Sequence, residues 1–353
     1  MRRLLLGLLL LVLALGIPFS TFAQDQELGW ELDAENYLDV SDLGFRFYYP
    51  VGWVWGTSAG GISFAENQAD LDAQLDDDDT TLPEGRIMSV LGIPLEALPP
   101  SDEPQDMQDY ADFVVEVGEI SESEARVEFP VMSRRSVSVI GENTRGRFGI
   151  GTIWTQNGYL VLTSLGVPDQ ATLNEMAYSW GVTIGSTRPL GAEELGKGRL
   201  VGETTPFTMN YPTTWTADEN QPTLVVFEEE DDIGKELPEI EGIGLTLAES
   251  PLADLGFEDN ATLDDVTGQL NTSFGLDETA THEEFFFLNQ PAQVSVGEIA
   301  DGSGGTKGLI LTTSVTEEGN AVIFVLIAPT AERAVEFMPT WVSMMQSVAS
   351  TAE

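Results

Sequence analysis

The densest run of side chains that could bind a cation is a set of four consecutive aspartates, Asp76, Asp77, Asp78 and Asp79. Hard cations such as Ca²⁺ take six to eight oxygen ligands, and a loop of carboxylates can supply several of them. The run lacks the Asp-x-Asp-x-Asp-Gly register of an EF-hand loop. The hypothesis is therefore a calcium site at these aspartates, and the alternative is a solvated loop of mutually repelling charges.

Side chains for catalysis are scarce. The chain has no cysteine, which excludes thiol catalysis, disulfides and cysteine-based metal sites. Its single histidine, His282, stands just before an apolar run and is typical of a surface residue at the start of a strand. No Walker-type loop or dinucleotide fingerprint is present. We therefore predict no catalytic residue and no cofactor other than the calcium hypothesised above. The alternative is a hydrolase that uses paired carboxylates, which leave no signature among 59 acidic residues.

Two distant stretches of the chain follow one template. Four residues of the first recur in the second at an offset of 162: Phe45, Tyr49, Pro50 and Trp53 return as Phe207, Tyr211, Pro212 and Trp215. Pro168 and Trp180 recur at an offset of 161. Residues 137–139 and 294–296 are both Val-Ser-Val and are aligned at a shorter offset. The acidic run 228–232 lies in the loop that corresponds to the one with the four aspartates. A period this long indicates a duplicated domain.

The tryptophans divide into two classes under this repeat. The repeated ones are expected to be core anchors: Trp53, Trp180, Trp215 and Trp341. Trp55 and Trp154 have no copy in the second half, so they are the candidate ligand-binding residues.

Both halves predict the element order β-β-β-α-β-β-β-α. Apolar residues at spacings of three and four predict helices over 106–117 and 263–274. A closing helix follows a proline in each half, over 170–180 and 331–348. Turn residues between apolar runs predict a hairpin before each closing helix. The fold class is therefore α+β: two homologous domains, each an antiparallel sheet covered by helices in an αβα sandwich.

The predicted boundaries follow from composition. Arg2 and Arg3, an apolar stretch and a small-residue site at Ala23 predict a signal peptide over 1–23, with an uncleaved anchor as the alternative. An acidic leader or short edge element follows over 24–42. The first domain spans 43–187, a Gly/Thr-rich linker spans 188–205, and the second domain spans 206–348. An extracytoplasmic location is expected, and no later segment is apolar enough to cross a membrane.

Fifteen basic against 59 acidic residues give a net charge of −44. Such a field repels nucleic acid and anionic lipid, so neither is expected as a partner. It favours cations, basic partners or high-salt surroundings. A cation-binding or salt-adapted envelope protein is therefore a further alternative for the function.

The opening Phe-x-x-x-Tyr-Pro-x-x-Trp of each half resembles the start of PsbP-like domains, as does Leu288-Asn289-Gln290-Pro291-Ala292 before a strand. In the first half the equivalent stretch, 132–136, departs from that pattern. The resemblance implies an antiparallel sheet sandwiched by helices, and roles in binding and assembly with no common catalytic residues. The leading hypothesis is an exported, non-catalytic binding or accessory protein whose partner is a protein or small ligand of basic character.

Overall fold

The structure is a computed structural model that describes residues 28–58, 61–76, 82–99, 106–118, 120–201, 207–218, 221, 223–235, 239–258, 261–276, 281–288, 290–301, 304–316 and 318–350. The predicted signal peptide lies outside these residues. The chain divides into two compact units, residues 1–190 and 191–353. In the described part, every helix is too short or too polar to cross a lipid bilayer.

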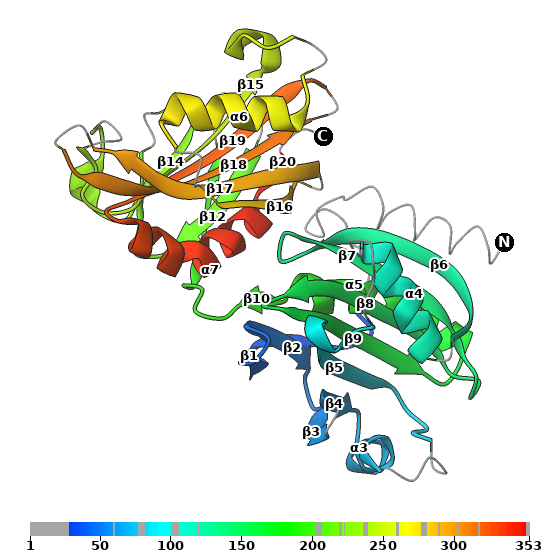
Figure 1. Cartoon of the computed structure of the whole chain (residues 1–353). Coiled ribbons are helices and arrows are strands. Elements are labelled where there is room, and N and C mark those ends of the chain that lie inside the picture. The colour runs from blue at the N-terminus through cyan, green and yellow to red at the C-terminus, as the bar shows by residue number, and fades with distance from the viewer. Residues whose placement is uncertain are drawn as a thin grey trace. The chain divides into compact units, whose positions relative to one another are not determined.

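Unit 1 is built on a seven-stranded antiparallel sheet in the order β3-β4-β5-β9-β8-β7-β6 (Figure 1). Its strands are β3 (Val54–Ser58), β4 (Gly61–Ala65), β5 (Ile87–Pro94), β6 (Ile120–Val131), β7 (Arg134–Asn143), β8 (Phe148–Gln156) and β9 (Tyr159–Val167). A smaller sheet holds β1 (Leu32–Val40), β2 (Phe45–Pro50) and β10 (Arg188–Pro189).

Helices cover both faces of the large sheet in unit 1. Helix α4 (Met107–Val117) buries Ala111 and Val114 against Ile153. Helix α5 (Gln170–Gly185) lies on the other face, where the indole of Trp180 donates to Thr152, the neighbour of Ile153 in β8. Successive side chains of a strand point to opposite faces, so these contacts define a sandwich. A third helix, α3 (Gln68–Leu75), packs beside β3 and β4.

Unit 2 has the same strand order, β13-β14-β15-β19-β18-β17-β16. These strands are β13 (Thr216–Ala217), β14 (Leu224–Phe227), β15 (Gly244–Pro251), β16 (Thr281–Phe287), β17 (Gln290–Ala300), β18 (Thr306–Val315) and β19 (Asn320–Ala328). The small sheet again holds three strands, β11 (Leu195–Val201), β12 (Phe207–Pro212) and β20 (Ala349–Ser350). Helices α6 (Leu263–Phe274) and α7 (Ala331–Ser347) lie on opposite faces of the large sheet (Figure 1).

The predicted α+β class is confirmed in both units, and the predicted helices and hairpins are present. Trp53 and Trp215 occupy equivalent places, each after the Tyr-Pro that ends β2 or β12, and each amide donates to that proline's carbonyl. Trp180, Trp215 and Trp341 are buried as anchors, whereas Trp53 is only half-buried.

Two predicted connecting segments contain strands instead. All of β1 lies in the segment 24–42, for which an acidic leader or a short edge element was expected. The linker over 188–205 contains β10 and β11. Both long strands owe their form to pairing with β2 or β12 across the small sheet, which local composition does not reveal.

The alignment of the two Val-Ser-Val motifs is wrong by one residue. Val137 belongs to the cluster beneath α4. Ala292 lies opposite Phe285, whose ring meets Trp341 of α7, and Val294 faces the same way two residues later. Val137 therefore corresponds to Gln293, because a one-residue shift turns a strand's side chains to the other face.

The first prediction concerns the repeated anchor after each Tyr-Pro. The Trp215 ring stacks on Phe337 at 5.0 Å and is 5% exposed. We expect Trp215→Ala to destabilise unit 2 by about 3–5 kcal/mol, the usual loss for a buried large aromatic. Trp53→Ala should cost unit 1 less, because that ring is half-buried. Hydrogen exchange read separately for the amides of each unit measures both effects; equal losses would contradict the assignment.

A second prediction uses one matched threonine pair. Thr152 Oγ1 accepts from Trp180 and bonds Ser138, whereas Trp341 Nε1 and the equivalent Thr312 Oγ1 have no hydrogen-bond partner among the described residues. Thr152→Val should destabilise unit 1 by about 1–3 kcal/mol, because it leaves a buried indole N–H unpaired. Thr312→Val should leave unit 2 unchanged or more stable. Hydrogen exchange on the full chain again reports both, and a loss in both variants would refute the difference.

Candidate binding surface

Among the described residues of unit 1, Trp55 is the largest exposed side chain: it is 46% accessible and stands on the edge strand β3. It lies opposite Phe64 of β4 in the ladder. The buried Phe64 ring also meets Tyr49 at 4.9 Å between centroids. We call Tyr49 and Trp55 the aromatic surface, because Tyr49 packs on the Phe64 ring and Trp55 is the ladder partner of Phe64.

A half-buried cation braces the chain next to this surface. Arg86 pairs with Glu66, and its guanidinium lies 5.9 Å and 6.0 Å from the ring centroids of Trp30 and Trp53. The same guanidinium donates to the Gly29 carbonyl at 3.3 Å. These contacts fix the segment before β1 against the start of β3, which positions Trp55.

Unit 2 lacks the aromatic surface. Val54 pairs with Ala65 and Thr216 pairs with Phe227 in the matching ladders, so Ala217 occupies the place of Trp55. β13 is also only two residues long. The shared fold therefore does not require a tryptophan at this place, and its presence in unit 1 needs another reason.

Trp154, the other predicted ligand residue, does not reach the surface. It is fully buried, packs against Phe45 at 5.5 Å and donates to Gln156. Ser314 occupies its place in unit 2. It had appeared to be a surface residue because it lacks a repeat, but both faces of β8 are covered. It is a core residue of unit 1, and the ligand prediction for it is not kept.

Of the predicted calcium ligands, the structure describes only Asp76, which ends helix α3; Asp77, Asp78 and Asp79 lie outside the described residues. Within the described part, no three acidic or histidine side chains come together in a way that could hold a metal. His282 is the second residue of β16, at the predicted strand start.

Two acidic residues near these runs have a different role. In unit 1, Asp70 Oδ1 accepts from the backbone N–H groups of Glu84 and Gly85, at 2.7 and 3.1 Å. In unit 2, Asp232 accepts from Glu241 and Gly242, with the Gly242 bond at 2.8 Å. Both carboxylates are buried. We call this arrangement the carboxylate clamp.

A glutamate completes each clamp four residues earlier. Glu66 accepts from the backbone N–H of Arg86, and Glu228 accepts from that of Ile243. Each clamp therefore binds the three residues that lead into β5 or β15. In unit 1 a Cβ on Gly85 would stand 2.5 Å from Asp70 Oδ2, so a larger residue there would displace the clamp carboxylate.

A cation also repeats beside each clamp. Arg147, just before β8, donates to the carbonyl of Pro83, and Lys307, at the start of β18, donates to that of Ile240. Lys235 pairs with Asp232 at 2.7 Å. The clamp was missed from the sequence. Its signal is there: Glu-x-x-x-Asp after the second strand and Glu-Gly before the third occur in both halves.

The clamp lowers the pKa of its aspartate in both units. Burial raises the pKa of Asp70, but hydrogen bonds from Gly85, Glu84 and Asn67 outweigh it, so the pKa lies below its ordinary value. Burial likewise raises the pKa of Asp232, and Lys235 with the two backbone donors brings it below the ordinary value.

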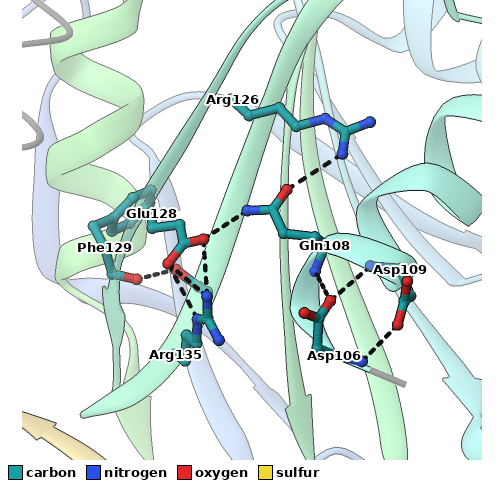
Figure 2. A network of polar contacts seen from close by, with 8 residues as sticks. Asp106, Gln108, Asp109, Arg126, Glu128, Phe129 and Arg135 are labelled. Carbon is teal, nitrogen blue, oxygen red and sulfur yellow. Dashed lines mark hydrogen bonds and ion pairs between the residues drawn. The ribbon is translucent and has the colours of Figure 1, made fainter. Parts of the chain in front are cut away.

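A second polar network joins α4 to the β6–β7 hairpin (Figure 2). Gln108 donates to Glu128 at 2.6 Å and accepts from Arg126, while Arg135 donates three hydrogen bonds to Glu128. These groups are exposed, and exposed ion pairs contribute about 0–1 kcal/mol. The network holds no nucleophile beside a base, so it is an orienting contact for α4.

No family model matches the chain, and no curated protein matches it. Among solved structures, it is similar to cyanobacterial PsbP (CyanoP) from Synechocystis sp. PCC 6803, with 15% identity over 47% of this chain and 96% of that one and a TM-score of 0.31. It is also similar to the Ran-binding protein Mog1p of Saccharomyces cerevisiae, with 10% identity, coverage of 46% and 97%, and a TM-score of 0.30. The PsbP-like resemblance expected from the sequence is thus found, and it concerns the fold alone.

The third prediction tests the clamp. A carboxylate whose pKa is lowered by folding stabilises the fold above its unfolded pKa of about 3.9, and that contribution is lost as the pH falls through the folded value. Asp232→Asn should therefore destabilise unit 2 by about 1–3 kcal/mol at pH 7. It should also flatten the loss of stability below about pH 4.

Urea unfolding of the full chain across pH measures both effects. Asp231→Asn, one residue away and exposed, is the matched control and should change neither. An Asp232→Asn variant as stable as wild type at pH 7 would show that the clamp does not hold the turn.

Proposed function

We propose that this chain is an exported binding or accessory protein that performs no chemistry of its own and engages its partner through the aromatic surface of unit 1. The observation that carries the proposal is Trp55, half-exposed on an edge strand where the matching strand of unit 2 has alanine. Exposed tryptophans are enriched at protein interfaces, where one large ring contributes much of the binding energy.

The absence of chemistry is supported by what the acidic residues do. Three aspartates are buried among the described residues, Asp70, Asp218 and Asp232, and of these Asp70 and Asp232 hold backbone N–H groups in the two clamps. A general acid or base needs an accessible group whose pKa is near the working pH. The clamp moves both pKa values the other way. One histidine and no cysteine leave few other routes to a nucleophile.

Export remains part of the proposal. It is supported by Arg2 and Arg3, the apolar stretch after them and the small-residue site at Ala23. A chain without thiols suits an oxidising compartment, since no cysteine can be mispaired there.

The fourth prediction tests this function. In the native host, the wild-type chain should be recovered from the extracytoplasmic fraction together with a partner. Trp55→Ala should lower recovery of that partner at least about tenfold, as expected when an interface hot spot is truncated. Its thermal unfolding should match wild type, because the ring is half-exposed. Val335→Ala, exposed on α7 of unit 2, is the control and should keep the partner. Partner recovery that does not depend on Trp55 would refute the proposed surface.

A further inference from the structure

The four edge strands of the two large sheets differ in how well they are protected against pairing with another chain. β6 carries two register irregularities and Pro130, β13 has two residues, and the sequence of β16 has His282 and two glutamates directly after its first residue. Bulges, shortness, charge and proline are the usual means of blocking an edge. β3 has none of them. It is Val-Trp-Gly-Thr-Ser, without a charge or proline, and pairs with β4 in unbroken register.

The two faces of β3 differ in character. Val54 packs into the cluster formed by Leu71 and Ile87, on the side of α3. A Cβ on Gly56 would meet Leu75 on that same side. Trp55 points to the other face, next to Phe64. A strand added to β3 would therefore alternate its side chains between the Trp55 ring and the flank of α3.

The charge beside this edge is negative. α3 holds Asp70 and Asp72, ends at Asp76 and contains no basic residue. Arg86, the cation that contacts Trp30 and Trp53, is already paired with Glu66. The whole chain carries −44. An incoming segment is therefore attracted if it is basic, and a second copy of this chain is repelled.

We propose that β3 accepts an extended, basic segment of a partner protein as an additional strand, with an arginine or lysine side chain stacked on Trp55. Main-chain hydrogen bonds to the edge give affinity in this mode, and alternate side chains give specificity. A cation over a tryptophan face adds to it. Five residues of β3 span about 17 Å, which fits a segment of about five or six residues. This inference rests on the proposed function and names the partner's chemistry.

The experiment uses the full mature chain and a fluorescein-labelled peptide of alternating arginine and valine, six residues long, read by fluorescence anisotropy. We expect saturable binding that weakens as salt is raised. Trp55→Ala should weaken it at least about tenfold, the scale of a lost hot spot. Val51→Ala, equally exposed but outside β3, should leave it unchanged. A peptide with prolines in place of the valines should not bind, because proline cannot donate to a ladder. A peptide with glutamate in place of arginine should not bind either.

Three outcomes overturn the inference. The first is no binding of the basic peptide. The second is binding that survives the proline substitutions or Trp55→Ala, which would be charge attraction alone. The third is self-association of the wild-type chain that Trp55→Ala abolishes, which would make a second copy the occupant of β3. If the peptide experiment shows no strand addition but partner recovery still depends on Trp55, only this inference is refuted. Partner recovery independent of Trp55 refutes the proposed function itself.

Discussion

A buried carboxylate determines how the chain enters the middle of each sheet. β5 and β15 pair on both sides, so a shift at their first residue would propagate to β4 and β9, or β14 and β19. The clamp prevents that shift, because Asp70 or Asp232 binds two successive N–H groups and the glutamate binds the third. In unit 1 the same turn leads into Arg86, whose side chain braces Trp30 and Trp53. The position of Trp55 is thus linked to the clamp through Arg86 and Trp53, the residue just before β3.

The two units share this strand order and this clamp, and they differ in the side chains that pack between the sheet and its helices. Beneath α4, the layer is apolar, with Ala111, Val137 and Ile153 in contact. The equivalent places beneath α6 hold Thr267, Gln293 and Thr313. Hydrophobic contact provides most of the energy of such a layer, so the second unit relies more on the cluster of Leu309, Leu311 and Val325 further along the sheet. One topology therefore tolerates different interiors, which leaves unit 1 free to carry a surface that unit 2 lacks.

Local patterns were enough to predict the helices and hairpins. Residues 263–274 form a helix with the predicted bounds, because the apolar spacing and the Thr262 cap act within one segment. β11 was not predicted and β1 was only one of two alternatives, since the form of both strands comes from pairing across the small sheet. Burial was the harder question. Trp55 and Trp154 look alike in sequence, and only the covering of β8 on both faces separates a core ring from a surface one. The clamp was harder to predict, because its carboxylates and its Glu-Gly turn lie in two separate segments. These two segments recur in the second half at different sequence offsets.

The negative charge of the chain determines which partners can pair with the unprotected edge strand β3. An apolar edge strand with an exposed tryptophan invites self-pairing, which most proteins prevent by placing a charge or proline in the strand itself. Here β3 contains neither, and the charge lies around it, on α3 and across the whole chain. Repulsion between like-charged copies acts over about 10 Å at 0.1 M salt, before backbone groups come within bonding distance. A charge inside the strand would block every partner alike. Charge placed around the strand opposes only acidic partners, so the same −44 that keeps copies apart draws a basic segment toward β3.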